Sequence, residues 1–103
     1  MEEFHTHEKF GERIHTLFII QKCFQTVSDK FLNEKLCNYL YKMAQDPVPN
    51  IRFNVAKAIE VVYPKLNNSN KEKCKDVLCK MESEDKDFDC TFYADKALKT
   101  ING

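Results

Sequence analysis

The stretch DPVPNIRFNVAKAI, residues 46–59, recurs in outline thirty-nine positions later as DKDFDCTFYADKAL, residues 85–98. The aligned pairs include Asp46/Asp85, Phe53/Phe92, Lys57/Lys96, Ala58/Ala97 and Ile59/Leu98. The same step backwards places Arg52 on Arg13. A period near forty residues is the signature of a stacked helical repeat, in which each unit is covered by its neighbours. The sequence therefore predicts an all-α solenoid fragment.

The composition is that of one small helical domain. The chain has 103 residues, 43% of them hydrophobic, with eight Phe but only two Gly and three Pro. So few chain-breaking residues favour long helices joined by short turns. Sixteen basic and sixteen acidic residues cancel, and because phosphate binding needs a concentrated positive field, we expect no nucleic-acid partner.

The sequence also predicts neither a membrane segment nor a secreted protein. The apolar run at residues 17–20 is far shorter than the roughly 20 residues that cross a bilayer. Residues 1–9 are polar and do not form a signal peptide. The five cysteines are an odd number, and Cys23, Cys37 and Cys90 fall on apolar helical stripes. We therefore expect a reduced, cytoplasmic location, with a nuclear one also compatible.

Apolar spacing and capping residues predict five helices. Their ranges are 9–27, 31–45, 51–63, 70–83 and 90–101. Asp46-Pro47 ends the second helix, and Asn50 is the predicted cap of the third. LYKM at residues 40–43 and LCKM at 78–81 match at a step of thirty-eight rather than thirty-nine. The turn that follows LCKM is therefore one residue longer than the turn that follows LYKM.

These helices divide the chain into a mobile segment and a repeat domain. Residues 1–8 form the segment, and residues 9–103 form the domain. Within it, 9–27 is the second helix of one repeat, followed by repeats 30–66 and 69–101. Each repeat is an antiparallel helix pair. The first helix lacks a partner, so its outer face should remain partly uncovered and offers a surface for self-association.

The segment DPVPNIRFNVAK at residues 46–57 resembles the loop and second helix of a HEAT repeat. With MAQDPV at 43–48 and DKDFDCTFYA at 85–94, it is similar to the C-terminal repeats of the scaffold (A) subunits of protein phosphatase 2A. The resemblance runs from about Phe10 to Ile101. Two positions depart from it: Thr91 stands where the repeat has a basic residue, and Cys90 where it has Val or Ile. Compared with that family the chain is expected to be a fragment or a truncated scaffold.

The resemblance implies a non-catalytic scaffold that needs no cofactor. In that family the loops within the repeats form a ridge on which the catalytic subunit docks, while regulatory subunits bind further N-terminal repeats that this chain lacks. Carried over by position, the partner-binding residues are Phe10, Arg13, Asp46, Pro47, Val48, Pro49, Asn50, Arg52, Lys86, Asp87, Phe88 and Asp89. The alternatives are a HEAT adaptor with a different protein partner, or a vestigial scaffold.

Several of these residues also have a purely internal interpretation. Arg52 either contacts a partner or belongs to an arginine–aspartate ladder between stacked repeats. Arg13 has no aspartate at the matching upstream position, where Thr6 or His7 falls, which favours a contact role. Val48 and Phe88 either contact a partner or seal the ends of their own helix pairs.

No motif indicates catalysis or metal binding. His5 and His7 have no third ligand at a plausible spacing, and Cys74 and Cys79 are five residues apart, which suits neither a redox pair nor a zinc site. The acidic cluster at 82–89 is interpreted as a solvated turn with negative charge before a helix N-terminus rather than as a cation site. No nucleophile–base constellation converges on one predicted face.

Overall fold

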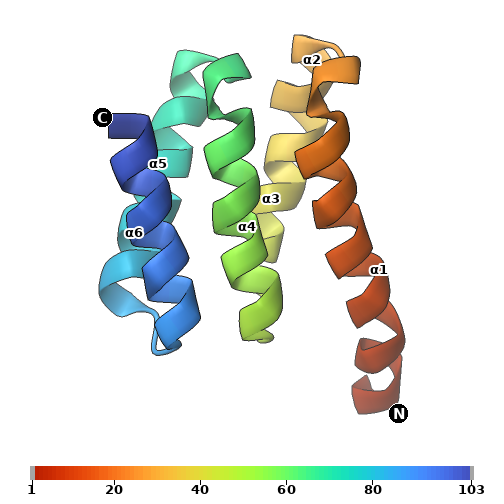
Figure 1. Cartoon of the computed structure of the whole chain (residues 1–103). Helices are drawn as coiled ribbons and strands as arrows, with labels where there is room; N and C mark the ends of the chain where they lie inside the picture. Colours follow the sequence, from red (N-terminus) through yellow and green to blue (C-terminus); the bar gives the residue numbers. More distant parts are fainter. Residues whose placement is uncertain (1, 103) are drawn as a thin grey trace.

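A computed structural model describes the backbone of residues 2–102 and the side chains of residues 11–102. Within this range every regular element is helical, and the prediction of an all-α, HEAT-like solenoid fragment is confirmed (Figure 1). The elements are α1 (Glu2–Cys23), η1 (Phe24–Thr26), α2 (Asp29–Phe31), η2 (Leu32–Leu36), α3 (Cys37–Met43), α4 (Pro49–Val62), η3 (Tyr63–Lys65), α5 (Asn68–Glu84) and α6 (Phe88–Asn102).

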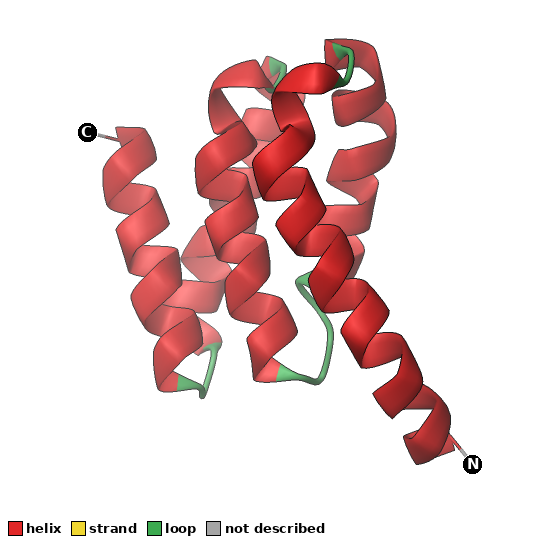
Figure 2. Ribbon diagram, turned by 45° about the vertical axis from the view of Figure 1, so that its right-hand side comes forward, coloured by secondary structure: helices red, strands yellow, loops and turns green. Residues whose placement is uncertain are grey.

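The helices form two layers. α1, α4 and α6 stand side by side in one layer, and the continuous helical segment α2–η2–α3 lies with α5 in the layer behind them (Figure 1). A lone helix is thus followed by two helix pairs, in the predicted order. The loops inside each pair lie at one end of the bundle and the turns between repeats at the other (Figure 2).

All five helical segments begin earlier than predicted, including α2 at Asp29 and α6 at Phe88, and the reasons are clear at two of these starts. α1 begins at Glu2 rather than near residue 9, so helix extends into the segment assigned to residues 1–8. α4 begins at Pro49 with Val48 as its N-cap, and the prediction that Asn50 caps this helix was wrong. Proline is favoured in the first helical turn, where its fixed φ fits and its missing N–H is not needed. α5 begins at Asn68, because the side chain of Asn67 caps it by accepting from the Asn70 N–H.

η2 explains why the step between the two repeats changes from thirty-nine to thirty-eight within the first helix of each pair. Ser28 and Asn67 occupy the same capping position at a step of thirty-nine, whereas Leu40 and Leu78 match at thirty-eight. The first helix of the first repeat therefore holds one more residue between Ser28 and Leu40 than the first helix of the second repeat holds between Asn67 and Leu78. η2 is a π-helical turn, in which the Cys37 N–H bonds the Leu32 carbonyl five residues back. This wider turn holds the extra residue without moving either end.

Polar side chains join the repeats at the end where the inter-repeat turns lie. Asn70 donates to the backbone oxygen and to Oδ1 of Asn33 at 3.0 and 2.9 Å, and its own Oδ1 accepts from the Tyr41 hydroxyl at 2.6 Å. Lys65 donates to the carbonyls of Phe24 and Val27 at 3.1 and 3.3 Å. The lysine thus satisfies carbonyl groups where α1 ends, and such groups lack intrahelical partners.

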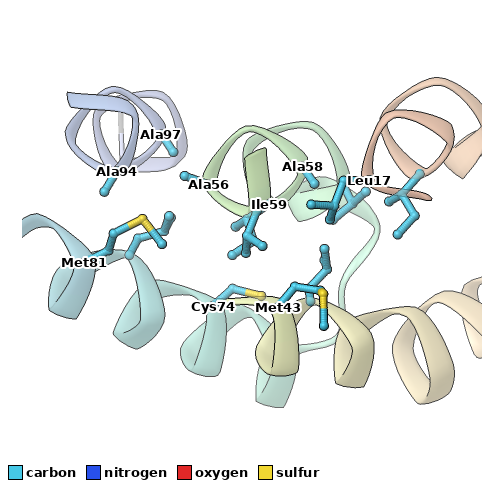
Figure 3. Packing of buried hydrophobic residues seen from close by; sticks show 14 of the residues in the cluster. Leu17, Met43, Ala56, Ala58, Ile59, Cys74, Met81, Ala94 and Ala97 are labelled. Atoms are coloured by element: carbon cyan, nitrogen blue, oxygen red, sulfur yellow. The ribbon is translucent and has the colours of Figure 1, made fainter. Parts of the chain in front are cut away.

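The core lies between the two layers (Figure 3). Ile59 points from α4 toward Met43 and Cys74 of the other layer, while small residues allow α4 to approach its neighbours closely: Ala58 lies beside Leu17 of α1, and Ala56 faces α6 (Figure 3). All these side chains are at least nine-tenths buried. The fold therefore buries a continuous core from α1 to α6, as a stack of repeats requires.

Candidate partner-binding site

The two loops within the repeats form one edge of the molecule, here called the loop edge and consisting of residues 46–50 and 85–89 (Figure 2). Each loop is closed by its own aspartate. Oδ1 of Asp46 accepts from the Val48 N–H at 2.9 Å, and Oδ1 of Asp85 accepts from the Asp87 N–H at the same distance. The local turn chemistry of both loops is therefore identical.

The guanidinium of Arg13 pairs with the aspartate of the following repeat. Its Nε lies 2.8 Å from Oδ2 of Asp46, and both side chains are largely buried. The contact role of Arg13 was predicted from the lack of an aspartate upstream of it. The carboxylate instead lies thirty-three residues downstream, because the pairing crosses from one repeat to the next.

Arg52 makes the corresponding contact one repeat later. Its Nε and Nη2 donate to the two carboxylate oxygens of Asp85 at 2.8 and 3.1 Å, again over thirty-three residues. Its Nη1 donates to the carbonyls of Asp46 and Pro47 at 2.9 and 3.0 Å. The internal arginine–aspartate ladder is therefore confirmed, and Arg52 binds its own loop and the next one together.

The Arg52–Asp85 pair also shifts the pKa values of both of its members. Burial alone would raise the pKa of Asp85, but the hydrogen bonds from Arg52 and from the Asp87 N–H outweigh it, and the pKa is lower than usual. The hydrogen bond to Asp85 in turn raises the pKa of Arg52. Both groups are therefore charged at neutral pH.

Other residues of the loop edge remain accessible. Phe88 is 78% exposed, the most exposed large apolar side chain among residues 11–102. Val48 is half-buried. The exposed residues beside them are Pro47, Pro49, Asn50, Lys86 and Asp89, with Asp87 half-buried. The structure thus divides the predicted site into ladder residues that hold the loops, Val48, which packs partly against the core, and accessible residues such as Phe88. Phe10 lies in α1, outside the residues whose side chains are described.

Two features were missed in the sequence. Asp85 was not assigned a role, although Arg13 precedes Asp46 by the same thirty-three residues as Arg52 precedes Asp85. Phe92 is 51% exposed on α6, one helical turn after Phe88. Its aligned residue Phe53 stacks on Tyr93 with 5.2 Å between ring centroids, whereas Phe92 touches Tyr93 only edge-on. The exposure of Phe92 follows from its place in the last helix.

The five thiols differ in their accessibility. All five cysteines are free; Cys37, Cys74 and Cys90 are buried, whereas Cys23 and Cys79 are exposed. Cys23 is thus exposed, although it was predicted to lie on an apolar stripe of its helix. Burial, together with the negative charge of Asp85, raises the pKa of Cys90 to about 12, which leaves it protonated at neutral pH.

The described residues contain no other obvious site. Residues 11–102 hold no group of three His, Cys, Asp or Glu side chains placed to bind a metal ion. A hollow of about 610 Å³ lies between α3 and α5, with Tyr41, Val77 and Met81 among its lining residues. In the same range no helix is long and apolar enough to cross a bilayer.

Comparison with known proteins reveals similarity to a phosphatase regulatory subunit. No family model matches the chain. It is 36% identical over 61 residues to the A-type regulatory subunit of protein phosphatase PP2A from Schizosaccharomyces pombe. That match covers 59% of this chain but 10% of the yeast protein. Together with the fold, the similarity supports a helical-repeat protein of the scaffold kind.

Proposed function

We propose that this chain is a non-catalytic scaffold module that binds a phosphatase catalytic subunit through its loop edge. The observation that carries the proposal is that both loops project from the same end of the stack while the Arg13–Asp46 and Arg52–Asp85 pairs lock them in register. The similarity to a phosphatase regulatory subunit suggests the class of partner. A set of loops held rigidly along one edge loses little entropy when it binds.

Phe88 is the anchor in this proposal. A large, exposed aromatic residue that is surrounded by polar groups is typical of a binding hot spot. The polar groups here are Lys86, Asp87 and Asp89. Val48 and the two prolines beside it form the corresponding apolar part of the first loop, and their backbone is stiffened by Pro47 and Pro49. The ladder arginines position these loops rather than contact the partner.

The test is capture of a purified phosphatase catalytic subunit by the immobilised chain. We expect Phe88→Ala and Val48→Asp to weaken capture, because both side chains lie on the loop edge. Phe31→Ala is the matched control, since Phe31 is 45% exposed on α2 at the opposite end of the bundle. Helical circular dichroism should be the same for all three variants.

Arg13→Glu is not a test of direct contact. It removes the ion pair with Asp46 and places two carboxylates together in a largely buried position, so the variant should lose stability before it loses a partner. If wild-type chain, Phe88→Ala and Val48→Asp all capture the catalytic subunit equally well, the loop edge is not the binding site. If wild-type chain captures none, the alternative of a HEAT adaptor with a different partner is favoured.

A further inference from the structure

We propose that Cys37 and Cys74 form an oxidation site, at which a hydroperoxide converts the two thiols into a disulfide between the repeats. Both cysteines are free and fully buried. Each lies in the first helix of a repeat, Cys37 in α3 and Cys74 in α5. Neither belongs to the loop edge, so the proposal is independent of the partner that binds there.

The packing of α5 beside the segment α2–η2–α3 brings the two thiols together. Both helical segments begin at the end of the bundle where the inter-repeat turns lie, so they run in the same direction (Figure 2). Asn70 donates to Oδ1 of Asn33 at 2.9 Å, which marks two facing positions. Cys37 and Cys74 each lie four residues later, about one helical turn beyond this contact. Their side chains hydrogen-bond to each other.

Tyr41 connects this pair of thiols to the surface. The Cys74 thiol lies 3.9 Å from the Tyr41 hydroxyl, which itself donates to Oδ1 of Asn70 at 2.6 Å. Tyr41 also lines the hollow of about 610 Å³ between α3 and α5. One side chain thus touches the buried thiol and borders the hollow. We therefore take the hollow as the route by which a small, uncharged oxidant such as hydrogen peroxide approaches the pair.

The contact between the two sulfur atoms makes the thiols unequal. The hydrogen bond with Cys74 outweighs burial and lowers the pKa of Cys37, whereas the same contact raises the pKa of Cys74. Cys37 therefore loses its proton first. Because the thiolate is the nucleophile in thiol oxidation, Cys37 is the sulfur that attacks the peroxide, and Cys74 remains a thiol until the second step.

The reaction balances with hydrogen peroxide as its only co-reactant. The Cys37 thiolate attacks one peroxide oxygen, the O–O bond breaks, and Cys37 becomes a sulfenic acid while the released hydroxide takes up the proton that Cys37 had lost. The Cys74 sulfur then attacks the Cys37 sulfur, the S–O bond breaks, and the Cys74 proton leaves with the hydroxyl group as water. The product joins α3 to α5, and a reducing thiol reverses it.

Cys90 shows that burial alone does not make such a site. Its side chain is as fully buried as those of Cys37 and Cys74. Its thiol, however, donates to the Pro49 carbonyl at 3.3 Å rather than to a second thiol, and its pKa is raised to about 12. Cys90 should therefore stay reduced under conditions that oxidise the pair, and it serves as an internal control.

The test uses the full chain with Cys23→Ser and Cys79→Ser, which removes the two exposed thiols and leaves the three buried ones. The folded protein is treated with a small molar excess of hydrogen peroxide, then unfolded in urea and alkylated with iodoacetamide. We expect alkylation of Cys90 alone and a mass loss of about 2 Da that a reducing agent restores. Peptide mapping without reduction should find the Cys37 peptide joined to the Cys74 peptide.

A second measurement separates the two steps. In the same background, Cys74→Ser should stop the reaction at the sulfenic acid of Cys37, which dimedone labels, whereas Cys37→Ser should leave Cys74 without label. Peroxide added to the chain in urea should show no preference for the Cys37–Cys74 disulfide over disulfides to Cys90. Alkylation of all three cysteines after treatment of the folded chain, or a disulfide that contains Cys90, would overturn the proposal.

Discussion

The guanidinium of Arg52 donates two hydrogen bonds to the carboxylate of Asp85, at 2.8 and 3.1 Å, although the two residues are thirty-three positions apart in the sequence. The arginine side chain is 19% exposed and the aspartate 8%. A two-point geometry of this kind fixes distance and orientation together. This planar contact therefore helps to fix the relative placement of the two helix pairs at the loop edge.

Arg52→Met should lower the free energy of unfolding by about 1.5–3 kcal/mol, because it leaves the Asp85 carboxylate with a single local donor. Urea denaturation followed by circular dichroism measures the change. Lys99→Met is the control, since the Asp95–Lys99 pair lies on the surface, and it should have no measurable effect. Equal stability of the two variants would contradict a structural role for the ladder.

The same pair should make stability depend on acid. The pKa of Asp85 is lower in the folded chain than the value of about 3.9 typical of an unfolded one. Its contribution is therefore fully present above about pH 4 and is lost as the pH falls through the folded-state pKa. The difference in unfolding free energy between wild type and Asp85→Asn should be constant from neutral pH to about pH 4 and shrink below it. A difference that does not change with pH would contradict the assignment.

Alkylation should distinguish two classes of cysteine. Iodoacetamide at neutral pH should modify Cys23 and Cys79 in the native chain and leave Cys37, Cys74 and Cys90 unreacted, because those three thiols are buried. All five should react in concentrated urea. Peptide mapping by mass spectrometry checks each position, and rapid native labelling of Cys90 would be inconsistent with its raised pKa.

Asn70→Ala should destabilise the chain by about 1–3 kcal/mol, because it leaves the buried groups around Tyr41 and Asn33 without their partner. Asn68→Ala, at an exposed position two residues earlier, is the matched control. Thermal unfolding of both variants measures the difference, and we expect the control to unfold near the wild-type temperature.

Gly11→Ala should stabilise the chain by about 0.5–1 kcal/mol. Gly11 lies inside α1, and an added Cβ would meet no atom within 4 Å. The gain comes from the lower helix propensity of glycine, not from a new contact. Chemical denaturation measures it, and a loss of stability would show that α1 is not helical at this position in solution.

Much of the fold could be predicted from periodic apolar residues and from the thirty-nine-residue step. These features predicted the helices, their order and an uncovered outer face on the first helix. Phe18 and Ile19 are exposed on that helix. The start of α4 was placed too late because Asn50 is a good cap by residue type, whereas Pro49 is already in the helix. Residue preference alone does not distinguish these two neighbouring starts.

The candidate site was harder to predict, because ladder residues and contact residues have the same spacing. Arg13 was interpreted as a contact residue, since its aspartate lies in the following repeat and not at the matching position upstream. Phe88 was identified from its place near a loop tip, and its exposure agrees with that prediction. Its contact with a partner remains a proposal.

The π-helical turn at Leu32–Leu36 has a consequence for how such chains change length during evolution. A single-residue deletion in most helices rotates every following side chain by about 100° and destroys the packing. Loss of the exposed Lys35 would instead tighten the wide turn into an ordinary one and leave Ser28 and Leu40 where they are. Neighbouring repeats can therefore diverge by one residue while their buried surfaces remain interchangeable.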